Sequence, residues 1–275
     1  MRHTTLLRRA ALAAALAAAP CASARAQQPK PADHKAATQT PPSNTTPATE
    51  AKGATTDSAA SPAATALPAN ATPVELARAA VAAQGGDKWR ALKNIVLFGT
   101  AVLYSPGSTQ SLAGKFYMVT AGDRVRLQVE SPIVNMTLVS DSTGTYTSIR
   151  GFQLPPASRF GVPVLMNYDQ PGYAVAALNS KKKERAFRIT EPEGMITDFY
   201  LDAATGRLVR FEVPYGPYTY GVEIKAVKDV DGVPVPTSFV QRISTGQGDF
   251  FAEFKVKEAK LNQELPADIF TFPKN

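Results

Sequence analysis

The chain of 275 residues is poor in the side chains that most often carry catalysis. It has one cysteine, Cys21, and two histidines, His3 and His34, all within the first 34 residues. The rest of the sequence therefore excludes a Ser-His-Asp triad, a cysteine nucleophile and a histidine-bearing zinc site. Carboxylates are plentiful, but no spacing selects a catalytic pair. We expect no enzyme, no catalytic residues, no metal site and no cofactor.

The sequence also lacks an uninterrupted apolar run long enough to span a membrane. Residues 1–26 instead have the pattern of an export signal. Arg2, Arg8 and Arg9 form its positive region, residues 10–19 are weakly apolar, and the Ala-Arg-Ala of residues 24–26 is a cleavage site. These features predict a secreted, periplasmic protein whose mature chain begins at Gln27.

Little net charge remains after that cleavage. The signal carries four arginines and no acid, so its removal lowers the formal net charge from +7 to +3. This balance does not favour nucleic acid as a partner. Cys21 also leaves with the signal. In an alternative interpretation Cys21 is acylated and the protein is a membrane-anchored lipoprotein, although Pro20 is a poor residue just before such a cut.

Residues 27–71 are almost free of large apolar side chains. They are rich in Ala, Pro, Thr and Ser, lack aromatic residues, and contain only Leu67 as a large aliphatic residue. Such a composition cannot offset the entropy of ordering and predicts a disordered linker. It is either a spacer left after secretion or a tether from a membrane. One domain, residues 72–275, remains.

The domain begins with a helix signal and continues as strands. Thr72, Pro73 and Glu75 form a capping box with proline at the first helical position. Residues 124–130 then alternate strictly, with Val125, Leu127 and Val129 on one side. Similar short segments recur to residue 261. We expect strands at residues 95–104, 110–120, 124–130, 135–141, 145–149, 186–190, 195–201, 208–213, 218–227, 239–243 and 250–261.

These segments predict a mainly β domain of about eleven strands joined by short turns. Asp231 and Gly232 are a strong hairpin signal. An antiparallel sheet of this size does not remain flat. Residues 155–183 interrupt the series with apolar side chains broken by Pro163, Pro171 and Gly172. So long a connection is either a loop packed on the sheet or a lid-like cover.

From the pattern alone, two interpretations of the apolar face of the sheet stay open. In the first, the face is an ordinary core filled by its own side chains. In the second, an incompletely closed sheet encloses a cavity for an apolar ligand. The parity of each strand leaves open which of its side chains point inward.

Three parts of the sequence resemble the LolA/LolB-like family of periplasmic lipoprotein carriers. They are residues 114–119 with the strand at 124–130, residues 137–146, and residues 266–273, which are similar to the closing strand of that family. The resemblance implies an unclosed antiparallel half-barrel, with an N-terminal helix and a lid-like connection over its open side. Where outer-membrane carriers of that family have a Lys-Arg-Pro motif with a gating arginine, this chain has Thr120, Ala121 and Gly122.

The resemblance implies a periplasmic, non-enzymatic carrier or binder of acyl chains, from a lipoprotein or another lipid. Its partners would be donor and acceptor proteins at the inner and outer membranes, and we expect a monomer. The alternative is an envelope interaction or stress-sensing module with a self-filled core, anchored through Cys21 if lipidated. The expected ligand-binding residues are Phe116, Met118, Val125, Leu127, Leu138, Phe199, Phe211, Ile224 and Phe254.

Overall fold

The computed structural model describes residues 66–273 except 109, 150–153, 182 and 247. The predicted export signal, Cys21 and most of the predicted linker lie outside these residues and stay predictions. No helix among the described residues is long and apolar enough to cross a membrane.

The first helix starts where the capping box predicts. Helix α1 spans Pro73–Ala83. The Glu75 backbone N–H donates to Thr72 Oγ1 at 3.3 Å, and the Thr72 N–H donates to Glu75 Oε2 at 2.7 Å. Gly85 and Gly86 then adopt positive φ values, which glycine tolerates without strain. They turn the chain into the one-turn helix α2, Asp87–Arg90, directly before the first strand.

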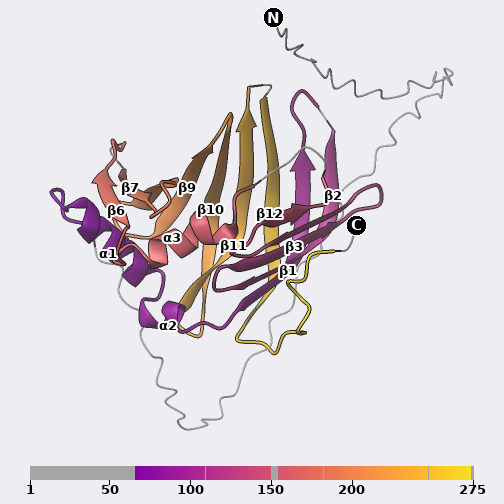
Figure 1. Cartoon of the computed structure of the whole chain (residues 1–275), viewed down its shortest axis with the longest axis horizontal. Helices are drawn as coiled ribbons and strands as arrows, with labels where there is room; N and C mark the ends of the chain where they lie inside the picture. The colour runs from indigo at the N-terminus through magenta and orange to yellow at the C-terminus, as the bar shows by residue number, and fades with distance from the viewer. Residues whose placement is uncertain (1–65, 109, 150–153, 182, 247, 274–275) are drawn as a thin grey trace, which may run out of the picture. The chain divides into compact units, whose positions relative to one another are not determined.

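The domain is one antiparallel sheet of twelve strands, open at both edges (Figure 1). Their order is β5-β4-β3-β2-β1-β12-β11-β10-β9-β8-β7-β6. Two meanders, β1 to β5 and β6 to β12, therefore join through the pair β1–β12. The predicted fold class is confirmed. The bounds are β1 Ile95–Tyr104, β2 Ser111–Ala121, β3 Arg124–Glu130, β4 Asn135–Ser140, β5 Thr145–Thr147, β6 Ala174–Ala177, β7 Glu184–Thr190, β8 Ile196–Asp202, β9 Leu208–Tyr215, β10 Tyr218–Val230, β11 Val233–Thr245 and β12 Gly248–Leu261.

Two expectations for the strands were wrong. Strand β6 was missed, because its four residues carry only one β-branched side chain and pair only with β7. Strand β11 starts earlier than expected, with Pro234 and Pro236. Proline is tolerated there because β12 pairs with β11 only from Ser238 onward. The pairing of β8 with β9 is irregular near Leu201, and Leu208 is buried there whereas Val209 is half-buried.

The sheet is strongly curved, as the connection between its two meanders demonstrates. This connection contains the 3₁₀ turn η1, Ala157–Arg159, and helix α3, Val162–Met166. The Ala157 N–H donates to Ser140 Oγ of β4 at 2.8 Å, and the Gly161 N–H donates to Thr197 Oγ1 of β8 at 3.3 Å. Four residues of chain reach at most about 14 Å. Strands β4 and β8 are eight places apart in the sheet order, which is about 38 Å in a flat sheet.

The convex face of β1 to β4 is covered by the C-terminal tail. Phe270 is buried against Val96, Val119 and Val139, with Ile269 and Phe272 beside it. Arg126 Nη1 donates to the Ile269 carbonyl at 2.9 Å, and the Arg124 guanidinium lies 4.7 Å from the Phe270 ring centre. The closing strand that the resemblance suggested at residues 266–273 does not form. Two successive backbone turns, at Ile269 and Thr271, replace it.

Candidate apolar binding site

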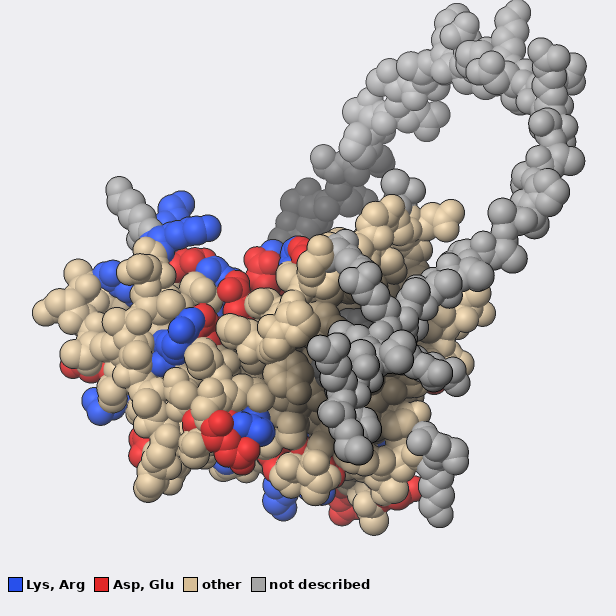
Figure 2. All heavy atoms as spheres, turned by 45° about the horizontal axis from the view of Figure 1, so that its top comes forward, with Lys and Arg blue, Asp and Glu red and all other residues tan. Residues whose placement is uncertain are grey.

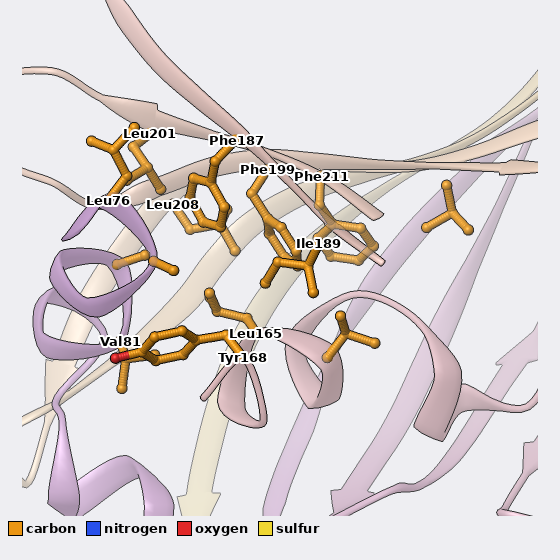
Figure 3. Close-up of a cluster of buried hydrophobic side chains, with 14 residues drawn as sticks. Leu76, Val81, Leu165, Tyr168, Phe187, Ile189, Phe199, Leu201, Leu208 and Phe211 are labelled. Carbon is orange, nitrogen blue, oxygen red and sulfur yellow. The ribbon is translucent and has the colours of Figure 1, made fainter. Parts of the chain in front are cut away.

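Two hydrophobic clusters share the concave face of the sheet. The helix-covered cluster lies between β7 to β9 and the helices α1 and α3 (Figure 3), and its buried members include Val164, Leu165, Phe187, Phe199 and Phe211. The central cluster lies on β1 to β4, β11 and β12. Its buried members are Leu97, Ala101, Phe116, Met118, Leu127, Val129, Val233, Val235, Phe239, Ala252 and Phe254.

Eight of the nine predicted ligand-binding residues belong to or pack against these clusters. Phe199, Phe211 and Ile224 belong to or pack against the helix-covered cluster. Val125 lies on the same strand face as Leu127, two positions away, and is half-buried. The structure thus brings together five predicted residues in or against the central cluster, namely Phe116, Met118, Leu127, Leu138 and Phe254.

Three aromatic rings occupy the middle of the central cluster. The Phe254 side chain is fully buried, stacks on Phe239 at 4.7 Å between ring centres, and meets Phe116 edge-on at 5.0 Å. Gly99 of β1 makes room for them, because a Cβ atom there would lie 2.7 Å from a Phe116 ring carbon and 2.0 Å from the Lys255 carbonyl oxygen. Phe239 was not among the predicted residues, although its strand alternation was visible in the sequence.

The helix-covered cluster is filled by its own side chains. Phe187 stacks on Phe199 at 5.2 Å, and α3 inserts the fully buried Val164 and Leu165. Just before α3, Gly161 has a φ of 64°, and a Cβ atom there would lie 2.8 Å from the Phe211 ring. The close approach of this backbone to Phe211 leaves no room for a ligand between them.

A short stretch, residues 155–161, fastens the two walls of the sheet to each other; we call it the strap. On the β4 side, neutral hydrogen bonds hold it, from Ala157 to Ser140 and from Thr145 Oγ1 to the Pro155 carbonyl at 2.9 Å. On the opposite side, Arg159 donates to Glu191 from Nε at 3.2 Å and from Nη2 at 2.5 Å. The predicted lid-like connection therefore covers the concave face, and it is bonded at both ends.

Arg159 compensates a buried charge. The Glu191 side chain is only 6% exposed, and the Glu193 and Met195 N–H groups also donate to it. Burial by itself raises the pKa of the Glu191 carboxyl, but the hydrogen bonds from Arg159 and from the two amides outweigh it, so the net pKa lies below its usual range. This ion pair was invisible in the sequence, because no motif links residues 32 positions apart.

The two ends of the concave face differ. At one end, the rim end, lie the β3–β4 and β9–β10 turns and the beginning of β12. Among the described residues, five of the six large apolar side chains that are exposed lie there: Ile133, Val134, Ile149, Tyr218 and Phe250. At the other end, the base end, Trp89 of α2 and Leu92 pack against the central cluster. Figure 1 shows α2 at this end of the sheet.

The outer surface has a less distinctive arrangement of side chains than the apolar concave face. On the side seen in Figure 2, basic and acidic side chains are interspersed among uncharged ones. A surface pocket of about 270 Å³ adjoins the strap and is lined by Arg159, Glu193, Met195 and Tyr215 among others. Within the described residues, no group of three or more His, Cys, Asp or Glu side chains is arranged to hold a metal ion.

Comparisons with known proteins relate the chain to solved structures only. Neither the family models nor the curated proteins give a match. A LolA superfamily protein of Nitrosomonas europaea matches with a TM-score of 0.48 and 10% identity, over 74% of this chain and 98% of the other. A putative outer membrane lipoprotein-sorting protein domain of Vibrio parahaemolyticus matches with a TM-score of 0.42 and 11% identity, over 72% and 95%.

A DUF1329 family protein of Desulfovibrio piger also matches, with a TM-score of 0.46 and 12% identity over 73% of this chain and 98% of the other. The first match carries the family name that the sequence resemblance suggested, and the second is described by lipoprotein sorting. Identities this low relate folds alone, and the function proposed below rests on the side chains of this chain.

Proposed function

We propose that the protein is a non-enzymatic binder or carrier of acyl chains, which it holds against the central cluster. The observation that carries the proposal is the composition of this wall. Its inward side chains on β1 to β4 are apolar from the base to the rim, apart from Ser140 and Thr120, while charged residues such as Arg126 and Lys115 point to the convex side.

The energetics of such a site are favourable. Each methylene group removed from water contributes about 0.8 kcal/mol, so a chain of about 16 carbons gains roughly 13 kcal/mol before ordering costs. The central side chains are buried against one another, so a ligand would replace contacts between side chains. Binding would then be weaker than into an empty pocket, which suits a carrier that must release its cargo.

A second candidate function is an envelope interaction module whose concave face is permanently filled. The helix-covered cluster favours it, because α1 and α3 already occupy that half of the face. In this interpretation the exposed rim residues contact a protein partner. The two candidates differ in one observable, the presence of an exchangeable lipid.

Native mass spectrometry of the gently purified protein tests the choice. The carrier proposal expects a bound mass that delipidation removes and added fatty acid restores, and uptake of an apolar dye that fatty acid displaces. Recovery of the bare mass alone, with no dye uptake after delipidation, would contradict the carrier and favour the interaction module.

The proposed location is the periplasm, with lipid donors and acceptors at the two membranes. The intact mass of the mature chain tests the anchor as well. A chain that begins at Gln27 supports a freely diffusing carrier, whereas a chain that begins at an acylated Cys21 supports a tethered one.

A further inference from the structure

The central cluster has one blocked end. Trp89 and Leu92 pack against it at the base, together with Ile95, Val230 and Leu261. Ile95 and Leu261 are register partners at the base ends of β1 and β12, so these side chains meet where the two central strands begin and end. Trp89 is half-buried, so it contacts both the cluster and solvent. Trp89 therefore separates the apolar wall from water at this end.

Within the part of the chain that the structure describes, no tryptophan packs against the central cluster at the rim end. There the inward side chains Leu103 and Leu112 are register partners at the far ends of β1 and β2, and Phe250 of β12 is 37% exposed. An apolar ligand thus meets accessible apolar surface at the rim and an aromatic barrier at the base. The polar head group has no charged partner in the central cluster and stays in water.

The length of the wall is comparable to that of one extended acyl chain. Ile95 and Leu103, both packed against the central cluster, are eight residues apart on β1, about 27 Å along a strand or about 20 Å along a barrel axis if the strand is tilted by ~40°. One lipid chain in a fluid bilayer occupies half of a hydrocarbon core that is about 30 Å thick, or about 15 Å, and the same chain is longer when it is fully extended. An extended chain that enters from the rim therefore brings its methyl end toward Trp89, whereas a bent or shorter chain ends before it.

We propose that Trp89 is the end stop of the acyl-chain site: the chain enters from the rim with its methyl end first, and the indole limits the length that the site accepts. Trp89 is thus a specificity-determining residue. The inference rests on the proposed acyl-chain function and adds to it a direction of entry and a limit on length.

The direction is measurable in the unmodified protein, because Trp89 is the only tryptophan of the chain. Stearic acids with a nitroxide quencher at carbon 16 or at carbon 5 are added separately to the full-length protein. We expect stronger quenching of Trp89 fluorescence, at equal occupancy, by the carbon-16 label. Equal quenching, or stronger quenching by the carbon-5 label, would overturn the proposed orientation.

The length limit is tested with Trp89→Ala and its matched control Trp89→Phe. Saturated fatty acids of 14 to 22 carbons compete with an apolar dye for each variant. For Trp89→Ala we expect the affinity for 20 carbons relative to 16 carbons to rise at least about tenfold, since burial of two of the four added methylenes already gives that factor. Trp89→Phe keeps an aromatic plug and the original preference.

Other outcomes have defined meanings. If Trp89→Ala weakens binding of all lengths equally, Trp89 is part of the wall and the end stop is wrong. Should the alanine variant fail to fold by circular dichroism, Trp89→Leu is measured in its place with the same expectation. If the unmodified protein binds no fatty acid of any length, the proposed function fails and the end stop falls with it.

Discussion

The helix-covered and central clusters lie on one curved sheet, yet they are filled in different ways. Leu165 of α3 is fully buried against the helix-covered cluster, and α1 closes its outer side. The central cluster, among the described residues, receives side chains from strands, from Trp89 of the one-turn helix α2 and from Leu92 just after it. The helix-covered cluster is thus a core between helices and the sheet. The central cluster lies mainly between strand faces, where a flexible apolar chain can bind.

The first prediction concerns the filled half and has the largest expected effect. Phe199→Ala removes a fully buried ring that stacks on Phe187, and we expect a loss of about 3–5 kcal/mol in the free energy of unfolding. Urea denaturation followed by circular dichroism measures it. The matched change at the rim, Tyr218→Ala, should cost less than about 1 kcal/mol. Equal losses in the two variants would show that the cluster is not a rigid core.

The second prediction concerns the strap. Arg159→Met leaves the buried Glu191 carboxylate without its cation, and we expect a loss of roughly 2–4 kcal/mol in unfolding free energy. The control is Arg242→Met, because the ion pair of Arg242 with Asp249 is about half exposed and should contribute no more than about 1 kcal/mol. If the two variants lose the same stability, the strap is not fastened by Arg159.

The third prediction separates the two faces of one strand. Leu138→Gln places an amide among the apolar side chains on the concave side of β4, and we expect fatty-acid affinity to fall about tenfold. Thr137→Gln, one position away on the convex side, should leave the affinity unchanged. Dye displacement measures both. Unchanged binding by Leu138→Gln, in a folded protein, would place the ligand elsewhere.

The fourth prediction is a small dependence of stability on pH. The lowered pKa of Glu191 means that its contribution is complete above the pKa of an unfolded glutamate and is lost as the pH falls through the lowered folded value. Glu191→Gln should therefore flatten the decline in unfolding free energy on the acid side of about pH 4.5. Parallel pH profiles for the two proteins would contradict this assignment.

The sequence revealed much of the fold because its signals are local. The capping box at Thr72, the turn at Asp231 and the alternation around Leu127 each depend on neighbouring residues. The strand β6 and the irregular pairing beside Leu208 depend on partners far along the chain, and no local signal reports them.

The candidate site was predicted less completely for the same reason. The alternation of apolar and polar residues predicted which side chains share one face of a strand. Five of the nine predicted residues do lie together in or against the central cluster. It could not reveal that α3 would cover Phe199 and Phe211, since that follows from the path of the strap. The strap itself depends on an ion pair between Arg159 and Glu191 that only the folded chain brings together.

The pairing of β1 with β12 has a consequence for the order in which the protein can fold. Lys93 and Asn262, which flank this pair, are joined by a hydrogen bond although they are 169 positions apart. The chain must lose the entropy of closing this long loop before the contacts between β1 and β12 can form and offset that cost. The topology therefore predicts slow folding. Until residues 248–261 are synthesised, β1 and β11 are both bare edges at the middle of the future sheet. A chain cut short before β12 should therefore aggregate rather than fold as a smaller domain.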